Sequence, residues 1–306
     1  MRYRRRPLAQ GQAFPRPLVR GGLWHCDQNT IKLQFYQPME DSRHRPIITL
    51  TTDFGLADHY VGTMKGVLLS RCPNAQLVDI SHEIPPFSIW AGAYTIDQAA
   101  RFFPPKTVHL VVVDPGVGTS RKPVLAEALG QYFIAPDNGV LSLVLRRHSN
   151  STVREITRRE LWLESVSATF HGRDLFAPSA AAIASGMVKP DEVGPQLPRP
   201  ELLPEIDPVE TEPQVWRGKV LSIDRFGNVI TSLSRNQFPQ ISCQAFSLLV
   251  GQHQIRNFRE TFGAARAGEL FAYFGSSGYI EIAVNQQNAA KQLEASPGMD
   301  VYLRLL

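Results

Sequence analysis

The chain has 306 residues, of which 43% are hydrophobic and 20% are charged. This length corresponds to about two average domains, and the hydrophobic share suffices for a sizeable core, which excludes a wholly disordered chain. No run approaches the roughly 20 consecutive apolar residues of a membrane-spanning helix, so we expect no membrane partner.

The formal net charge of +4 is distributed unevenly. Residues 1–45 hold nine of the 32 Lys and Arg but only three of the 28 Asp and Glu, which gives this segment a charge of +6. It has no sustained periodicity, so we predict a basic, disordered and dispensable extension. The alternatives are a transit peptide, a nucleic-acid-binding arm or sequence upstream of the true start. The remaining residues carry 23 basic and 25 acidic side chains, so no nucleic-acid partner is expected.

The cysteines indicate neither a disulfide framework nor a zinc site. Cys26, Cys72 and Cys243 lie far apart and form no CxxC pair. The motif that starts at His82 is not the HExxH of zinc hydrolases, because Pro86 occupies the position of the second histidine. We therefore expect no metal and a reducing, cytoplasmic location.

Strand-like and helix-like segments alternate between residues 46 and 189, the first predicted domain. Alternation at this spacing predicts an α/β domain with a mostly parallel central sheet. Ligands of such sheets bind beyond the carboxyl ends of the strands, where Asp53 and Asp114 are expected. The predicted strands are 45–53, 75–81 and 107–114, and the predicted helices are 60–72, 89–103 and 177–186.

A proline-rich segment separates this domain from a second one. Seven prolines lie within residues 190–213, and this density predicts an extended linker without helix or sheet. Residues 214–306 then contain short β-rich runs separated by turns, which predicts a smaller antiparallel domain, either β-barrel-like or a sandwich. The runs are 216–224, 229–233, 246–250, 270–274, 279–284 and 299–305.

Three clusters in the first domain could carry chemistry, and each also has a structural interpretation. Asp53 could bind the hydroxyls of a ribose or cap the following helix. Asp114 precedes a Pro/Gly-rich loop that ends at Arg121; the loop resembles a phosphate loop but lacks the GK[ST] ending, so a tight turn is the alternative. His171 lies between a β-compatible and a helical stretch, as a catalytic or a structural histidine could.

Two further clusters lie in the second domain. Asp224 and Asn228 bracket a turn, and Ser276 belongs to a second turn-rich stretch. Taken separately, each cluster is also explained by the preference of turns for Asp, Asn, Ser and Gly.

Taken together, the motifs resemble the S-adenosyl-L-methionine hydroxide adenosyltransferase family, the hydrolytic relatives of fluorinating and chlorinating enzymes. The resemblance runs from about residue 46 to the end of the chain. Seven motifs carry it, in order: TTDFG (51–55), DISHEIPPF (79–87), VVDPGVGTSR (112–121), PDNG (136–139), FHGRD (170–174), IDRFGN (223–228) and SSGYIEIAVN (276–285).

This resemblance implies an enzyme that hydrolyses S-adenosyl-L-methionine to adenosine and L-methionine, by in-line attack of water or hydroxide on the ribose 5′-carbon. The S-adenosyl-L-methionine is the substrate, and no cofactor is implied. The subunit would have an α/β domain and a β-barrel, and would assemble as a homotrimer. Each substrate would lie between the first domain of one subunit and the second domain of its neighbour.

The resemblance also implies roles for particular residues of the first domain. Asp114, Arg121 and His171 would form the triad that orients the attacking water, and Asp53 would hold the ribose hydroxyls. Whether Asp114 or His171 takes the proton is left open.

The implied contacts of the second domain are with the two ends of the substrate. Asp224 would bind the methionine ammonium and Ser276 its carboxylate. The edge of adenine would contact Asn228. Adenine would also contact Val284 and Gln286, chiefly through their backbone atoms.

Two other functions compete with hydrolysis. A halogenase is disfavoured, because the Asp114 carboxylate would stand near the halide position and two close anions in a dry pocket repel by several kcal/mol. At Ser277 the fluorinating branch carries an arginine that this chain lacks. A non-catalytic protein that binds S-adenosylmethionine or a nucleoside would keep Asp53, Asp224 and Asn228 but would not need the triad.

Overall fold

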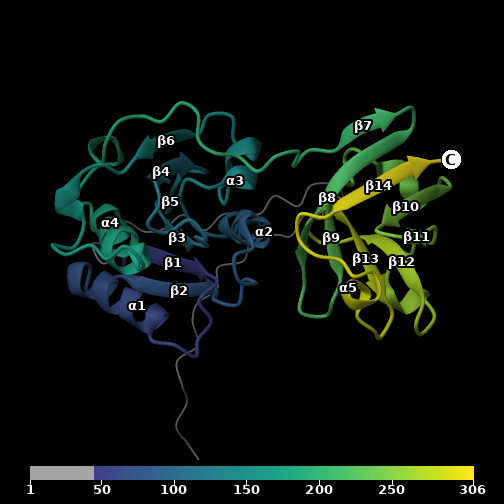
Figure 1. Cartoon of the computed structure of the whole chain (residues 1–306), viewed down its shortest axis with the longest axis horizontal. Helices are drawn as coiled ribbons and strands as arrows, with labels where there is room; N and C mark the ends of the chain where they lie inside the picture. The colour runs from purple at the N-terminus through teal and green to yellow at the C-terminus, as the bar shows by residue number, and fades with distance from the viewer. Residues whose placement is uncertain (1–44) are drawn as a thin grey trace, which may run out of the picture. The chain divides into compact units, whose positions relative to one another are not determined.

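The structure is a computed structural model, and it describes residues 45–306 (Figure 1). The predicted basic extension of residues 1–45 lies, apart from Arg45, outside the described residues. Over the described part of the chain, no helix combines the length and the apolar character that crossing a membrane requires.

The first part of the chain forms a six-stranded sheet with the order β2-β1-β3-β5-β4-β6. Strand β1 runs parallel to β2 and β3, and β3 runs parallel to β5, whereas β4 runs antiparallel to β5 and β6. The predicted α/β class is confirmed, but the sheet is mixed. The strands are β1 (Ile47–Thr52), β2 (Gln76–Ser81), β3 (Val108–Val112), β4 (Pro123–Ala128), β5 (Gln131–Pro136) and β6 (Thr152–Glu155).

The β4–β5 hairpin is what makes the sheet mixed, and the sequence did not predict it. Its turn consists of Leu129 and Gly130, which both have positive φ, at 58° and 70°. Two consecutive residues of positive φ reverse the chain with the twist that a tight hairpin needs. Leucine is uncommon in such a turn, so the usual Asn-Gly or Asp-Gly signal is missing.

Helices cover both faces of this sheet (Figure 1). Along β3 and just beyond it, Val108, Leu110 and Val112 pack with the α1 and α4 residues, whereas Val111 and Val113 pack with those of α2 and α3. This alternation follows the period of two of a strand whose two faces are both buried. The helices are α1 (Tyr60–Arg71), α2 (Ile89–Ala100), α3 (Ser142–Arg147) and α4 (Ala177–Ala184).

The second sheet is antiparallel and nearly closed as a barrel, as predicted. Its order is β11-β10-β14-β8-β9-β13-β12, and a bridge between Phe258 and Ala272 connects the segment after β11 to β12. A short helix, α5 (Ala289–Gln292), precedes the last strand. The strands are β8 (Val215–Ile223), β9 (Val229–Ser234), β10 (Phe246–Val250), β11 (His253–Ile255), β12 (Leu270–Phe274), β13 (Tyr279–Val284) and β14 (Asp300–Leu305).

The prediction that residues 190–213 contain no helix or sheet is wrong. A 3₁₀ turn forms at Pro190–Glu192, and strand β7 (Val209–Glu212) pairs antiparallel with β8. Pro208 and Pro213 flank this strand rather than interrupt it, so no proline has to donate to the ladder. The domain boundaries at 46–189, 190–213 and 214–306 stay a prediction.

Helix α2 also contacts the barrel. Ala93 of α2 belongs to one buried cluster with Leu221 of β8 and Tyr279 of β13. Beside this cluster, the Arg147 guanidinium lies 3.0 Å from the buried carboxylate of Asp97 and donates to the Tyr279 hydroxyl at 2.8 Å. A buried apolar contact and a charged contact therefore link the two parts.

Candidate active site

The first group of predicted site residues lies at the carboxyl ends of two neighbouring parallel strands. Asp53 directly follows β1, and Asp114 follows β3 by two residues. Because β1 and β3 pair in parallel, with Thr52 opposite Val112, their ends meet at one edge of the sheet. Burial raises the pKa of Asp53, and the charge of the neighbouring Asp114 adds a smaller effect in the same direction.

Asp114 and Arg121 form a buried ion pair. The Arg121 Nε donates to both carboxylate oxygens of Asp114 at 2.9 Å, and the side chains are only 5% and 8% exposed for Asp114 and Arg121. The guanidinium also lies over the ring of Phe176, 5.1 Å from its centroid. A bidentate, buried pair of this kind is strongly directional, so the orientation of the carboxylate is fixed.

His171 shares the same guanidinium. Its Nδ1 lies 2.7 Å from the Arg121 Nη2. Arginine can only donate, so Nδ1 must be an acceptor, and the proton of the ring resides on Nε2. Burial, and next the Arg121 charge, lower the pKa of His171, which favours the same neutral form.

Glycine is needed where the Asp114 loop meets the segment before His171. Gly118 has a φ of +79°, and a Cβ at this position would lie 2.5 Å from the carbonyl oxygen of Ala168. Any other residue would therefore push the two segments apart. This close approach brings Arg121 and His171 together, and it explains the glycine in the 112–121 motif.

Asp53 faces the loop after β2 and does not cap α1. Its Oδ2 accepts a hydrogen bond from the backbone N–H of Phe87 at 2.9 Å, and the Phe87 side chain is 72% exposed. Burial raises the pKa of Asp53. The sequence analysis did not single out Phe87; its positive φ of 66° is visible only in the structure.

His82 supports the end of β1 and has no metal site around it. Its Nδ1 lies 2.8 Å from the Thr52 hydroxyl, and its Nε2 lies 3.0 Å from a carboxylate oxygen of Asp79. Within residues 45–306, no three His, Cys, Asp or Glu side chains gather as a metal site would require.

The second group of predicted site residues lines one cavity of about 700 Å³ in the barrel. Every lining residue comes from the segment 224–287, so none of Asp53, Asp114, Arg121 and His171 is among them. Five predicted residues line it: Asp224, Asn228, Ser276, Val284 and Gln286. The others are Phe226, Phe262, Tyr273, Gly275, Glu281 and Gln287.

Asp224 is held by the turn that it begins. Its Oδ1 accepts from the backbone N–H groups of Phe226 and Asn228 at 2.9 and 2.8 Å, and its Oδ2 accepts from the Asn228 amide at 2.7 Å. A carboxylate has about four lone pairs, so one site on Oδ2 is left for a ligand. The turn interpretation of this motif and its place in a binding site are therefore compatible.

Three of the six cavity residues that the sequence analysis did not single out are linked by side-chain contacts. Phe262 packs edge-on against Tyr273, with ring centroids 5.2 Å apart, and the Tyr273 hydroxyl donates to the Glu281 carboxylate. Glu281 lies in a strand that is otherwise uncharged, and this isolated charge could have marked it as a candidate site residue. No comparable signal marked Phe262.

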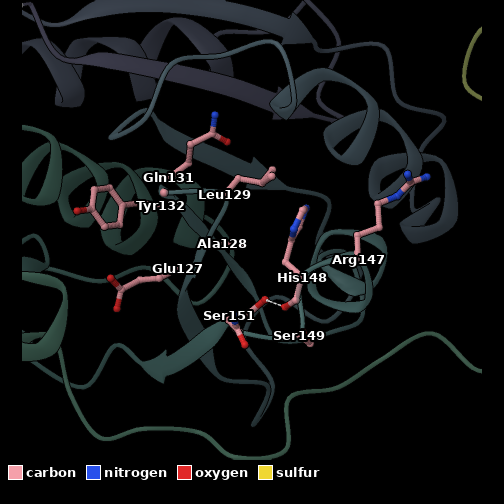
Figure 2. A pocket seen from close by; sticks show the side chains of 11 residues that line it. Glu127, Ala128, Leu129, Gln131, Tyr132, Arg147, His148, Ser149 and Ser151 are labelled. Atoms are coloured by element: carbon pink, nitrogen blue, oxygen red, sulfur yellow. Dashed lines mark hydrogen bonds between the residues drawn. The ribbon is translucent and has the colours of Figure 1, made fainter.

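A separate cavity of about 460 Å³ lies between the β4–β5 turn and the end of α3, and no predicted site residue lines it. Glu127 and Tyr132 lie on one side of it and His148 and Arg147 on the other (Figure 2). Figure 2 marks a hydrogen bond from the Ser151 hydroxyl to the backbone carbonyl of His148. Its polar groups do not converge on a common point.

The fold and these two clusters define a class of two-part proteins with an α/β lobe and a β-barrel. Within that class, the chain belongs to the SAM hydroxide adenosyltransferase family. The model of the family's N-terminal domain matches residues 48–194, and the model of its C-terminal domain matches residues 218–302.

The relatives carry two kinds of name. A protein from Thermus thermophilus named (R)-S-adenosyl-L-methionine hydrolase is 38% identical, with 85% of this chain and 99% of that protein covered. Further relatives with that name are 33–37% identical. A protein from Actinopolyspora mzabensis named fluorinase is 29% identical, with 86% of this chain and 98% of that protein covered.

A solved structure has the same fold. The crystal structure of an uncharacterized conserved protein from Thermotoga maritima superposes with a TM-score of 0.76 at 38% identity. The superposition covers 84% of this chain and 99% of that chain.

Proposed function

We propose that this protein hydrolyses S-adenosyl-L-methionine to adenosine and L-methionine, acting on the (R) epimer at sulfur. The observation that carries the proposal is the buried cluster in which Arg121 binds both Asp114 and His171. The relatives named (R)-S-adenosyl-L-methionine hydrolase are 33–38% identical, whereas those named fluorinase are 28–29% identical, which supports water over halide as the nucleophile.

In this proposal the cluster orients one water molecule. His171 would donate its Nε2 proton to the water, because Nδ1 is engaged with Arg121. Asp114 would accept a proton from the same water, since Oδ1 keeps a lone pair beside the Arg121 bond. Asp114 is thus the better candidate for the base, and its charge would repel a halide.

The departing group needs no acid. A sulfonium leaves as a neutral thioether, so no proton has to be delivered to methionine. The protein must instead hold the water in line with the carbon–sulfur bond; such positioning can supply up to about 7–11 kcal/mol, and a positioned base about 10²–10⁴-fold in rate.

The remaining predicted residues would bind the substrate. Asp53 would accept from the ribose hydroxyls, beside the exposed ring of Phe87. Asp224 would bind the ammonium through the free site on Oδ2, and Ser276 the carboxylate. Adenine would contact Asn228, Val284 and Gln286, which line the cavity.

We also propose a homotrimer whose sites lie between subunits. The barrel cavity is lined only by barrel residues, so the Asp114 cluster that completes it would come from a neighbouring copy. Phe226 at this cavity is 78% exposed and Phe87 beside Asp53 is 72% exposed. Large aromatic side chains left in water at both half-sites are typical of surfaces that another copy covers. The free thiols of Cys72 and Cys243 fit the proposed cytoplasmic location.

The test is incubation of the purified protein with S-adenosyl-L-methionine in ¹⁸O-labelled water, with and without chloride. We expect methionine and adenosine that carries ¹⁸O at its 5′-hydroxyl, at equal rates in both buffers. Binding without turnover would show a non-catalytic binding protein, and a chlorinated nucleoside would show a halogenase; either result would overturn the proposal.

A further inference from the structure

Glu281 is built into the wall of the barrel cavity. It belongs to β13, whose six side chains are all buried, and it is only 8% exposed. Its Oε2 accepts from the Tyr273 hydroxyl, and its Oε1 accepts from the Ser277 hydroxyl at 3.3 Å. A Cβ on residue 275 would lie 1.8 Å from Oε1, so glycine at that position makes room for the carboxylate.

The charged side chains that line this cavity are all acidic. Two carboxylates, Asp224 and Glu281, line it, and none of its eleven lining residues, all within the described part of the chain, is Lys or Arg. Burial, and to a smaller extent Asp224, raise the pKa of Glu281, and a neighbouring cation would oppose both effects.

Both carboxylates keep unused acceptor sites. Asp224 has one on Oδ2, and each oxygen of Glu281 accepts a single bond from the protein. An ammonium group has three donors and can therefore bridge two carboxylates. A ligand carboxylate would find no cation here and would meet mainly the Ser276 hydroxyl, because the Ser277 hydroxyl already donates to Glu281.

We infer that Glu281 is a second acceptor, with Asp224, for the ammonium of the substrate, and that the cavity selects ligands for their ammonium far more than for their carboxylate. This inference rests on the proposed function, since it concerns the amino-acid end of the same substrate. It adds a specificity-determining residue and a specificity rule: a decarboxylated substrate is accepted, whereas a deaminated one is rejected.

The test uses thioether analogues, which do not react with water because their leaving group would be a thiolate rather than a neutral thioether. S-adenosyl-L-homocysteine, its deaminated form and its decarboxylated form are titrated calorimetrically into the wild type and two variants. Glu281→Gln keeps the shape of the side chain and one acceptor oxygen, and its NH₂ group can donate to the second hydroxyl, but the charge is removed. Glu212→Gln is the matched control, since Glu212 lies on the exposed strand β7 and pairs with Arg304 outside the cavity.

For the wild type, we expect the deaminated ligand to bind about 10–100-fold more weakly than S-adenosyl-L-homocysteine, as loss of a hydrogen-bonded charge implies, and the decarboxylated ligand less than about 5-fold more weakly. Glu281→Gln should weaken the two amino-containing ligands about tenfold or more and leave the deaminated ligand unchanged. Glu212→Gln should match the wild type with all three.

Two results would overturn the inference. One is a Glu281→Gln variant that folds, by thermal unfolding, but weakens all three ligands equally or none of them. The other is a wild type that loses more affinity without the carboxylate than without the amino group. Turnover of S-adenosyl-L-methionine, measured in parallel, reports on the proposed function itself, so a hydrolase in which Glu281 has no such role is told apart from a protein that is no hydrolase.

Discussion

Arg121 determines which nitrogen of His171 carries the proton, because a guanidinium donates and never accepts. It binds the oxygens of Asp114 and leaves His171 with its proton on Nε2. An acceptor and a donor are thus held next to each other at the end of the sheet.

Replacing Asp114 by Asn should therefore affect the chemical step rather than binding. The amide keeps the size of the side chain but cannot take a proton, and its NH₂ group faces the Arg121 donors. We expect kcat to fall about 10²–10⁴-fold with little change in the dissociation constant of the substrate. Single-turnover assays beside calorimetric binding measure the two quantities. A variant with wild-type kcat would contradict the role of Asp114.

Replacing Asp53 by Ala should have the opposite effect. The substrate loses a charged acceptor for its ribose hydroxyls, so affinity should fall by about 1–3 kcal/mol, or about 5–150-fold, while the oriented water is unaffected. Calorimetric titration checks the affinity, and kcat at saturating substrate should change less than KM. A larger effect on kcat than on KM would place Asp53 in the chemical step instead.

At the scale of the elements, three strands of the first sheet share a buried polar network. His109 on β3 lies 2.7 Å from the Thr49 hydroxyl on β1 and 3.1 Å from the Gln131 amide oxygen on β5. The Gln131 amide nitrogen donates to backbone carbonyls, so its oxygen must accept from His109. Burial lowers the pKa of His109 to about 4, and the ring is neutral in the folded protein.

This network predicts a loss of stability in acid. Below a pH of about 6.5 the unfolded chain protonates His109 while the folded chain does not, so the free energy of unfolding falls as pH drops from about 6.5 to about 4 and then levels off. The contribution over that range is about 3 kcal/mol. Urea unfolding at several pH values measures it. A His109→Gln variant should show a shallower slope there; equal slopes would contradict the prediction.

The strands also show which sequence patterns were sufficient to predict secondary structure. Continuous β-branched runs predicted β1 and β3, because burial of both faces leaves a strong local pattern. The β4–β5 hairpin was missed, since its turn is Leu-Gly and β4 contains a single β-branched residue, Val124. Strand β7 was missed because prolines flank it and gave the segment the composition of a linker. Composition alone does not show whether prolines lie beside a strand or within it.

For the site, residue types alone left each motif ambiguous between binding and turn chemistry. The resemblance to a family suggested five residues that the structure finds around one cavity. Glu281 and Tyr273 escaped notice because their hydrogen bond joins two strands, β12 and β13, and depends on their register. Pairwise contacts of this kind are a property of the folded sheet and leave little trace in composition.

At the scale of the whole molecule, the basic extension is expected to be dispensable. Its charge of +6 contrasts with the nearly neutral remainder, and both family models begin after it. A protein lacking residues 1–44 should therefore keep its melting temperature and its turnover of S-adenosyl-L-methionine. Calorimetry and the adenosine assay check this. Precipitation of the shortened protein, or loss of most of its activity, would show that the segment contributes to the fold or to the site.

The proposed assembly makes the sharpest prediction at this scale. If each site combines the first part of one subunit with the barrel of its neighbour, Asp53 and Asp224 of one chain serve different sites. Because each substitution removes a contact that binds the substrate, chains with Asp53→Ala and chains with Asp224→Asn would each have low activity when the substrate concentration is well below the wild-type KM. The second substitution keeps an oxygen that can accept from the backbone N–H groups of Phe226 and Asn228, so the turn should survive.

Mixing the two variants under conditions of subunit exchange should restore activity. Random assembly gives about one quarter of the sites an intact residue from both chains, so activity should recover to about a quarter of the wild-type value. The matched control mixes Asp53→Ala with Asp114→Asn. Both of these substitutions lie in the first part, so every site keeps one defect and the activity of the mixture should stay as low as that of the variants alone. Exchange is verified by native mass spectrometry of differently labelled chains. If the activity of the first mixture stays low after verified exchange, or if the control recovers equally, the site does not lie between subunits.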